Sequence, residues 1–232
     1  MPMRPVPLRR RLLLLAAVAI LPLALMSGVA LQALLEQQRR QAEQSTLDLA
    51  RALATAVDTE LRLTISALQS LALTDSFGNS GEADLARAHA SARRALATRP
   101  EWRAVLLATP AGAPVFGTAT EFGETPQPIT EPETIAEVVR TNAPVIGALT
   151  RGPRGNVGVP VRVPVERDGT LRYVLTAIVR PEAILRVVSA QRIPEDWTVS
   201  VFDSRGARVA RSREHERFLG TPPSPSLAAL IA

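Results

Sequence analysis

The chain has 232 residues, 46% of them hydrophobic, with no cysteine and a formal net charge of +5 at pH 7. The absence of cysteine excludes disulfides, zinc–thiolate sites and cysteine nucleophiles. All 27 basic residues are arginine, and residues 1–40 hold six of them against one acid, so residues 41–232 are neutral overall. With an aromatic content of only 3% and no basic stripe, nucleic acid is not an expected partner.

An uncharged stretch, Leu12–Leu35, is long enough for a helix that crosses a hydrocarbon core of about 30 Å. Four arginines precede it and two follow, so the positive-inside rule favours a cytoplasmic N-terminus over residues 1–11. We therefore expect a single-pass protein of the cell inner membrane, with the lipid bilayer as a partner and the remaining chain in the periplasm. A cleaved signal peptide is the alternative, because the small residues Ser27–Ala30 suit a cleavage site, but the apolar run is longer than such peptides require.

Apolar residues continue at alternating spacings of three and four through residues 36–75, which predicts one long helix. Its stripe is rich in Ala and Leu, which suits packing on its own domain or the seam of a parallel homodimer. Both arrangements can hold at different heights of the helix. The candidate dimer positions are Leu47, Ala50, Ala54, Val57, Leu61, Leu68 and Leu71.

Beyond this helix the pattern predicts an α+β fold with an antiparallel sheet. A second helix, started by a capping box at Asn79, reaches Thr98, and His89 lies on its apolar face as an expected core residue. The other elements follow in chain order: a hairpin over 104–118, a short helix over 130–140, strands over 159–166 and 171–179, a helix over 181–190, and a hairpin centred on 203–206. Asp168-Gly169 is a strong hairpin turn, and Pro160 and Pro164 both lack an N–H on one side of their strand, which indicates an edge or a bulge there.

Few residues are candidates for chemistry. His89 and His215 are the two imidazoles, neither stands in a nucleophile motif, and no group of residues has metal-ligand spacing. No catalytic residue, metal or cofactor is therefore expected, and the chain as it stands is not expected to be an enzyme. The glycine-rich loop 151–158 enters a strand rather than a helix, so we expect an ordinary mobile loop; the alternative is an anion site formed by its arginines and backbone N–H groups.

The segments after the long helix resemble the extracytoplasmic double-Cache (tandem PAS-like) sensor regions of bacterial sensor histidine kinases, particularly those of the HWE type. The matching segments are Pro100-Glu101-Trp102, Val163-Pro164-Val165, Asp168-Gly169, Tyr173-Val174-Leu175, Ile193–Trp197, and Val201–Gly220 with Ser224–Leu227 after it. The resemblance implies an N-terminal transmembrane helix, a long membrane-proximal helix, a first PAS-like (Cache) unit over 76–190, and the opening hairpin of an incomplete second unit over 191–232. The Arg-x-Trp-Tyr signature of some amino-acid-binding Cache domains is absent near Trp102.

The resemblance further implies a membrane-anchored, ligand-sensing input module of a two-component receptor, without the kinase output in this chain. In that family further strands, a second membrane helix and cytoplasmic domains follow, so we expect a fragment of a longer receptor or a truncated gene product. The expected ligand is an unknown small molecule, with a small carboxylate as the candidate, and its expected contacts are Trp102, Arg151, Arg154 and Tyr173. A stand-alone anchored periplasmic scaffold or binding protein is the alternative, and an extracytoplasmic hydrolase ranks third because no base and nucleophile assemble.

Overall fold

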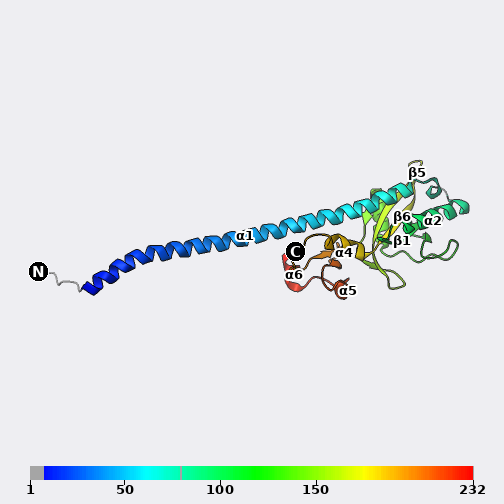
Figure 1. Ribbon diagram of the computed structural model, residues 1–232. Coiled ribbons are helices and arrows are strands. Elements are labelled where there is room, and N and C mark those ends of the chain that lie inside the picture. Colours follow the sequence, from blue (N-terminus) through cyan, green and yellow to red (C-terminus); the bar gives the residue numbers. More distant parts are fainter. Residues whose placement is uncertain (1–7, 79, 232) are drawn as a thin grey trace. The chain divides into compact units, whose positions relative to one another are not determined.

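The computed structural model describes the backbone of residues 8–78 and 80–231, and side chains within residues 26–27, 31–78 and 80–229 (Figure 1). The chain divides into two compact units, Met1–Ala52 and Leu53–Ala232. The helices are α1 (Leu8–Ala72), the 3-10 helix η1 (Asp75–Phe77), α2 (Glu82–Ala97), α3 (Pro132–Thr141), α4 (Pro181–Ser189), α5 (His215–Phe218) and α6 (Pro225–Ile231). The strands are β1 (Trp102–Ala108), β2 (Pro114–Gly117), β3 (Val145–Ile146), β4 (Thr150–Arg151), β5 (Val157–Arg167), β6 (Thr170–Val179), β7 (Ser200–Phe202) and β8 (Arg208–Arg211).

The first unit consists of the N-terminal part of α1. Its described side chains are exposed except that of Leu49, which is half-buried, and ion pairs one turn apart, such as Arg39–Glu43 at 3.2 Å, lie on its surface. Within the part of the chain that the structure describes, no helix has both the length and the apolarity that crossing a membrane requires. Most of the predicted span over residues 12–35 falls outside the described side chains.

The second unit is built on an antiparallel sheet in the order β2-β1-β6-β5-β3, with β4 also paired to β5. One face of the sheet is covered by the C-terminal end of α1 and by α2, as Figure 1 shows beside β1 and β6. The core between them is formed by buried residues of both helices and of the strands, among them Leu68, Ala92, Val105, Leu107, Val161, Val163, Leu175 and Ala177. The predicted α+β fold with an antiparallel sheet is therefore confirmed.

The central hairpin β5–β6 follows directly from its sequence. Asp168 and Gly169 both have positive φ values, 52° and 71°, which a two-residue hairpin turn of the primed type requires. Valines 159–165 at odd positions face the core, whereas Pro160, Arg162 and Pro164 face the other side of the sheet. On the edge of β5 away from β6, the described strands that pair with it are the two-residue strands β3 and β4. The pairing is interrupted at Pro160, as expected for a residue without an N–H group.

The β7–β8 hairpin packs on α4 and on α1 rather than joining the first sheet. Ile184 of α4, Val209 and Ala210 of β8, and Val159 form a small core against which Val57 and Leu61 are packed. Two strands alone are marginal in water, so this apolar contact with helices stabilises the hairpin. The predicted hairpin centred on residues 203–206 is confirmed, with Gly206 at its turn at φ 76°.

The turn between β5 and β6 also fastens the end of α1. Arg167 donates hydrogen bonds from Nη2 to the backbone oxygen of Thr74 at 2.7 Å and to that of Ala72 at 3.4 Å. The side chain of Arg167 crosses Gly78 so closely that a Cβ there would overlap it. The Ala72 carbonyl is one of those that a helix leaves unpaired at its C-terminus, and the guanidinium of Arg167 satisfies it.

Two local expectations differ from the structure. The N-cap of α2 is Gly81, and Asn79, the expected cap, lies outside the described residues. The expected mobile loop over 151–158 is largely a hairpin, because β4 pairs with the start of β5 at Thr150 and Gly158. The candidate dimer positions along α1 differ in burial. Leu68 is 0% exposed, and Val57, Leu61 and Leu71 are half-buried against their own domain. Leu47, Ala50 and Ala54, closer to the N-terminus, are exposed.

Candidate functional site

A cavity of about 140 Å³ lies on the face of the sheet opposite the α1–α2 core. Its floor is made of Ala104, Leu106 and Ile178, which alternate along β1 and β6 with residues of the core. The loop before α3 and the β4–β5 hairpin close over it with Gln127, Pro128, Thr130, Thr150, Gly152, Pro153, Arg154 and Asn156. An apolar floor with polar groups at the rim is typical of a small-molecule site.

Close approach of backbones at one edge of the cavity depends on Gly158. A Cβ at this position would overlap the side chain of Ile178 and lie 3.1 Å from the backbone oxygen of Val179. Any larger residue would therefore push Ile178 into the cavity or open the sheet.

Two arginines give the cavity its charge. Arg154 is exposed at the rim, and Arg103 lies beside the floor, where its Nη2 is 3.8 Å from a carboxylate oxygen of Glu182. The Nε of Arg103 is buried and has no hydrogen-bond partner among the described residues. The site therefore offers a cationic environment with an unused donor, which favours an anionic ligand group.

A buried arginine lies in the sheet next to the cavity wall. Arg162 is 1% exposed, and its Nη2 donates to the backbone oxygen of Thr130, a cavity residue, at 2.7 Å. Burial lowers the pKa of Arg162 to about 10, against the opposing effect of the Glu131 and Glu133 carboxylates. Its Nε and Nη1, and the Thr176 hydroxyl opposite it on β6, make no hydrogen bond to any described residue.

The carboxylate that faces Arg162 belongs to Glu131, the N-cap of α3 at φ 57°. The Glu131 side chain is 4% exposed, and both it and Arg162 lie against Gly147, which has no side chain to separate them. Arg205, from the β7–β8 turn, approaches the same carboxylate with its Nη2 at 2.9 Å. Neither carboxylate oxygen of Glu131 accepts a hydrogen bond from any described residue, so both keep unused acceptor capacity.

The structure separates the ligand contacts that the sequence predicts. Arg154 lines the cavity, whereas Trp102 and Tyr173 are buried in the core on the opposite face of the sheet. The indole N–H of Trp102 donates to the Thr64 hydroxyl of α1 at 3.4 Å. Arg151 is exposed and points back into its own hairpin, where it donates to the backbone oxygen of Gly155 at 2.8 Å.

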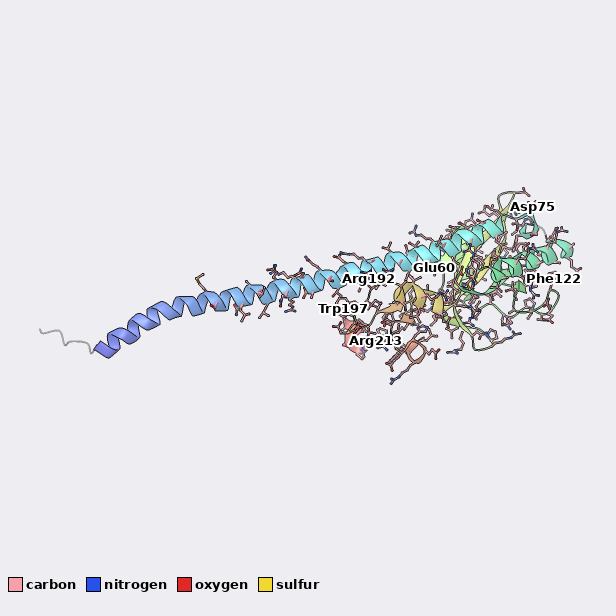
Figure 2. The ribbon with its side chains drawn as sticks, in the orientation of Figure 1. Glu60, Asp75, Phe122, Arg192, Trp197 and Arg213 are labelled. Atoms are coloured by element: carbon pink, nitrogen blue, oxygen red, sulfur yellow. The ribbon has the colours of Figure 1, made fainter. Side chains whose placement is uncertain are left out.

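Arg103, Glu131, Arg162 and Thr176 were not singled out from the sequence. Arg162 did carry a signal, because it is the one charged residue in the run Val159–Val165 and it stands between two prolines. The expected role of His89 as a core residue agrees with its position: its ring lies 5.3 Å from that of Phe116 and 5.8 Å from that of Phe122, which Figure 2 labels. Among the residues that the structure describes, no group of His, Asp and Glu is placed to hold a metal ion.

No family model matches the chain, and no curated protein matches it. Solved structures do match. The ligand-binding domain of the Campylobacter jejuni chemoreceptor Tlp3, in complex with 4-methylisoleucine, is similar over 78% of this chain and 74% of its own, at 15% identity and a TM-score of 0.61. The ligand-binding domain of the Pseudomonas fluorescens chemoreceptor CtaA, in complex with L-isoleucine, is similar over 73% of this chain and 68% of its own, at 12% identity and a TM-score of 0.51.

An extracellular ligand-binding receptor from Desulfohalobium retbaense is similar over 78% of this chain and 33% of its own, at 14% identity and a TM-score of 0.55. Likeness at these identities concerns the fold alone. The chain therefore has the Cache-like α+β fold of chemoreceptor ligand-binding sensory domains.

Proposed function

We propose that this chain is the ligand-sensing input module of a membrane-anchored signal-transduction receptor, and that the cavity over β1 and β6 binds a small molecule with a carboxylate. The observation that carries the proposal is the meeting of Arg103 and Arg154 at a small cavity on a Cache-like sheet. Concave sites with an apolar floor and a few placed polar groups are the usual places for small ligands.

The lining of the cavity suits a ligand that has an aliphatic part and a carboxylate. Leu106 and Ile178 offer an aliphatic surface, and the two arginines offer donors to a carboxylate. Tlp3 and CtaA were crystallised with isoleucine and its relatives, so small aliphatic amino acids and carboxylic acids are the first compounds to test. The small volume of about 140 Å³ favours compounds of this size over larger ones.

The proposed receptor is a two-component sensor histidine kinase, held in the inner membrane by residues 12–35 with its sensor unit in the periplasm. The excess of arginine on the N-terminal side of the apolar stretch supports this orientation. The exposed Leu47, Ala50 and Ala54 support a parallel homodimer along α1.

The ligand is tested with a thermal-shift screen of amino acids and small carboxylates on the purified full chain, followed by calorimetric titration of any hit. Arg154→Ala removes one charged hydrogen bond and is expected to weaken binding roughly ten- to hundredfold. Arg151→Ala is the matched control, because it removes the same charge from the same hairpin outside the cavity. Equal loss in both variants, or none in either, contradicts the cavity as the site.

The membrane anchor is tested separately. We expect the full chain to resist carbonate extraction, and a reporter fused after Ala232 to be active only in a form that works outside the cytoplasm. Release of a shortened soluble protein would instead support the cleaved signal peptide.

A further inference from the structure

The β7–β8 hairpin contains a second cationic site, distant in sequence from the cavity residues of the first sheet. Its centre is Arg208 in β8, which is 7% exposed. Its Nε donates to the Ser200 hydroxyl at 3.2 Å, and its Nη1 donates to the Thr221 hydroxyl. The guanidinium also lies over the rings of Phe202 and Phe218, at 4.9 Å and 5.4 Å from their centroids.

Within the described part of the chain, the charge of Arg208 has no anionic partner. Among the ion pairs of the described residues none includes Arg208, and its neighbour on the same strand is a second cation, Arg211. Burial and the charge of Arg211 both lower the pKa of Arg208. Aromatic rings and neutral hydroxyls compensate a buried cation only in part, and buried charges are ordinarily paired.

Both guanidiniums open onto a depression of about 430 Å³ that is also lined by Thr198, Ser200 and Ser224. Nη2 of Arg208 makes no hydrogen bond to any residue that the structure describes and so remains available as a donor. The Ser200 hydroxyl accepts from Arg208 and keeps its own proton to donate, whereas the Thr221 hydroxyl already donates to the backbone oxygen of Phe218 at 2.7 Å. Arg211 contacts a carboxylate oxygen of Glu214 at 3.5 Å, and that carboxylate is itself largely exposed.

We propose that this depression binds an oxyanion, which Arg208, Arg211 and the Ser200 hydroxyl hold together. Two guanidiniums and one hydroxyl supply convergent donors, the arrangement by which proteins bind phosphate, sulfate and carboxylate groups. The bound anion supplies the counter-charge that Arg208 otherwise lacks. The same chemistry comes either from a free inorganic anion or from a carboxylate, so the test distinguishes the two.

The test uses calorimetric titration of the purified full chain with inorganic phosphate, sulfate and acetate, at constant ionic strength maintained with chloride. We expect saturable binding of at least one of these anions. Arg211→Gln is expected to weaken it roughly ten- to hundredfold, and Ser200→Ala roughly two- to tenfold. Acetate binding at least as strong as phosphate binding assigns the site to carboxylates, and the reverse order assigns it to inorganic oxyanions.

Arg217→Gln is the matched control, because it removes a neighbouring charge whose side chain pairs with Glu214 and does not line the depression. Arg217→Gln is expected to leave anion binding unchanged. Arg154→Ala, which alters the cavity of the first sheet, is also expected to leave it unchanged, so the result distinguishes this proposal from the proposed ligand site in that cavity. Absence of saturable binding overturns the proposal, and so does an equal loss in Arg211→Gln and Arg217→Gln. If Arg211→Gln does not fold, Ser200→Ala, which keeps both charges, decides the question.

Discussion

A carboxylate oxygen of Glu131 lies 2.9 Å from the guanidinium of Arg205, which joins the first sheet unit to the turn of the β7–β8 hairpin. Glu131 also faces the buried Arg162 in β5, so one carboxylate lies between two arginines from different parts of the fold. The same turn is held by Asp203, whose carboxylate accepts from the backbone N–H of Leu149 at 2.7 Å. The hairpin is therefore attached to the unit that holds the cavity by polar contacts as well as by its apolar packing.

Removing the arginine of this contact should destabilise the protein. Arg205→Gln leaves the Glu131 carboxylate with only its buried partner, and we expect a loss of about 1–2 kcal/mol in the free energy of unfolding, between the values for exposed and buried ion pairs. Urea denaturation measures this loss in the free energy of unfolding. Arg213→Gln removes an exposed arginine of the same segment, labelled in Figure 2, and should change stability little. Equal losses would show that the contact contributes nothing specific.

Arg205 should also contribute to the lowered pKa of Glu133. The pKa of Glu133 is lowered most by a hydrogen bond from its own backbone N–H at the start of α3; burial opposes this, and a hydrogen bond and the charge of the Arg205 guanidinium lower the pKa further. A carboxyl whose pKa is lower in the folded state stabilises the protein above its unfolded pKa, and this stabilisation disappears as the pH falls through the folded pKa. In Arg205→Gln the pKa of Glu133 should rise, as followed by the carboxyl carbon shift in an NMR titration. An unchanged pKa of Glu133 in this variant would mean that the backbone hydrogen bond at the start of α3, and not Arg205, lowers the pKa.

The longer elements of the fold could be predicted from the sequence because each is specified locally, whereas the short elements β3, β4, α5 and α6 were not expected. The Asp168-Gly169 turn and the alternating valines define β5–β6 without help from distant residues. The site could not be predicted in the same way. Strict alternation places Trp102 on the face of Ala104 and Leu106, but a bulge between Trp102 and Ala104 turns the indole to the core.

The burial of Arg162 could not be predicted from the local sequence either. Its position in the strand places it on the face away from the core, and a charged residue on such a face is usually solvated. Burial of this side chain depends on Thr130, Glu131 and Gly147, which come from the loops around α3 and β3. No local pattern brings these segments together, so the polar cluster is visible only in three dimensions.

The close approach at Gly158 can be tested by adding a single methyl group. We expect Gly158→Ala to lower stability by about 1–3 kcal/mol, because the new Cβ overlaps Ile178, and to weaken ligand binding through the narrowed cavity. Gly152→Ala is the control for stability alone, because its Cβ would meet only the backbone oxygen of Asn156 at 3.6 Å, although Gly152 also lines the cavity. Thermal unfolding and the calorimetric titration give the two readouts. A stable Gly158→Ala that binds normally would show that the sheet adjusts at no cost.

The proposed dimer seam should be confined to the exposed part of the α1 stripe. Single cysteines at Leu47, Ala50 and Ala54 should form crosslinks between chains under mild oxidation. Cysteines at Arg51 and Asp58, off the stripe, should crosslink less. A cysteine at Leu68, which is fully buried against the sheet, should not crosslink in the folded protein. Equal crosslinking at all six positions would contradict a specific seam.

Arg167 makes the end of α1 mechanically part of the sheet. The last turn of a helix commonly frays, because its carbonyls have no partners within the helix. Here Arg167, at the end of β5, donates to the carbonyl of Ala72, the last residue of α1, and to that of Thr74 just beyond it, which holds the helix terminus to the hairpin. A displacement of the β5–β6 hairpin is therefore expected to move the end of α1 with it.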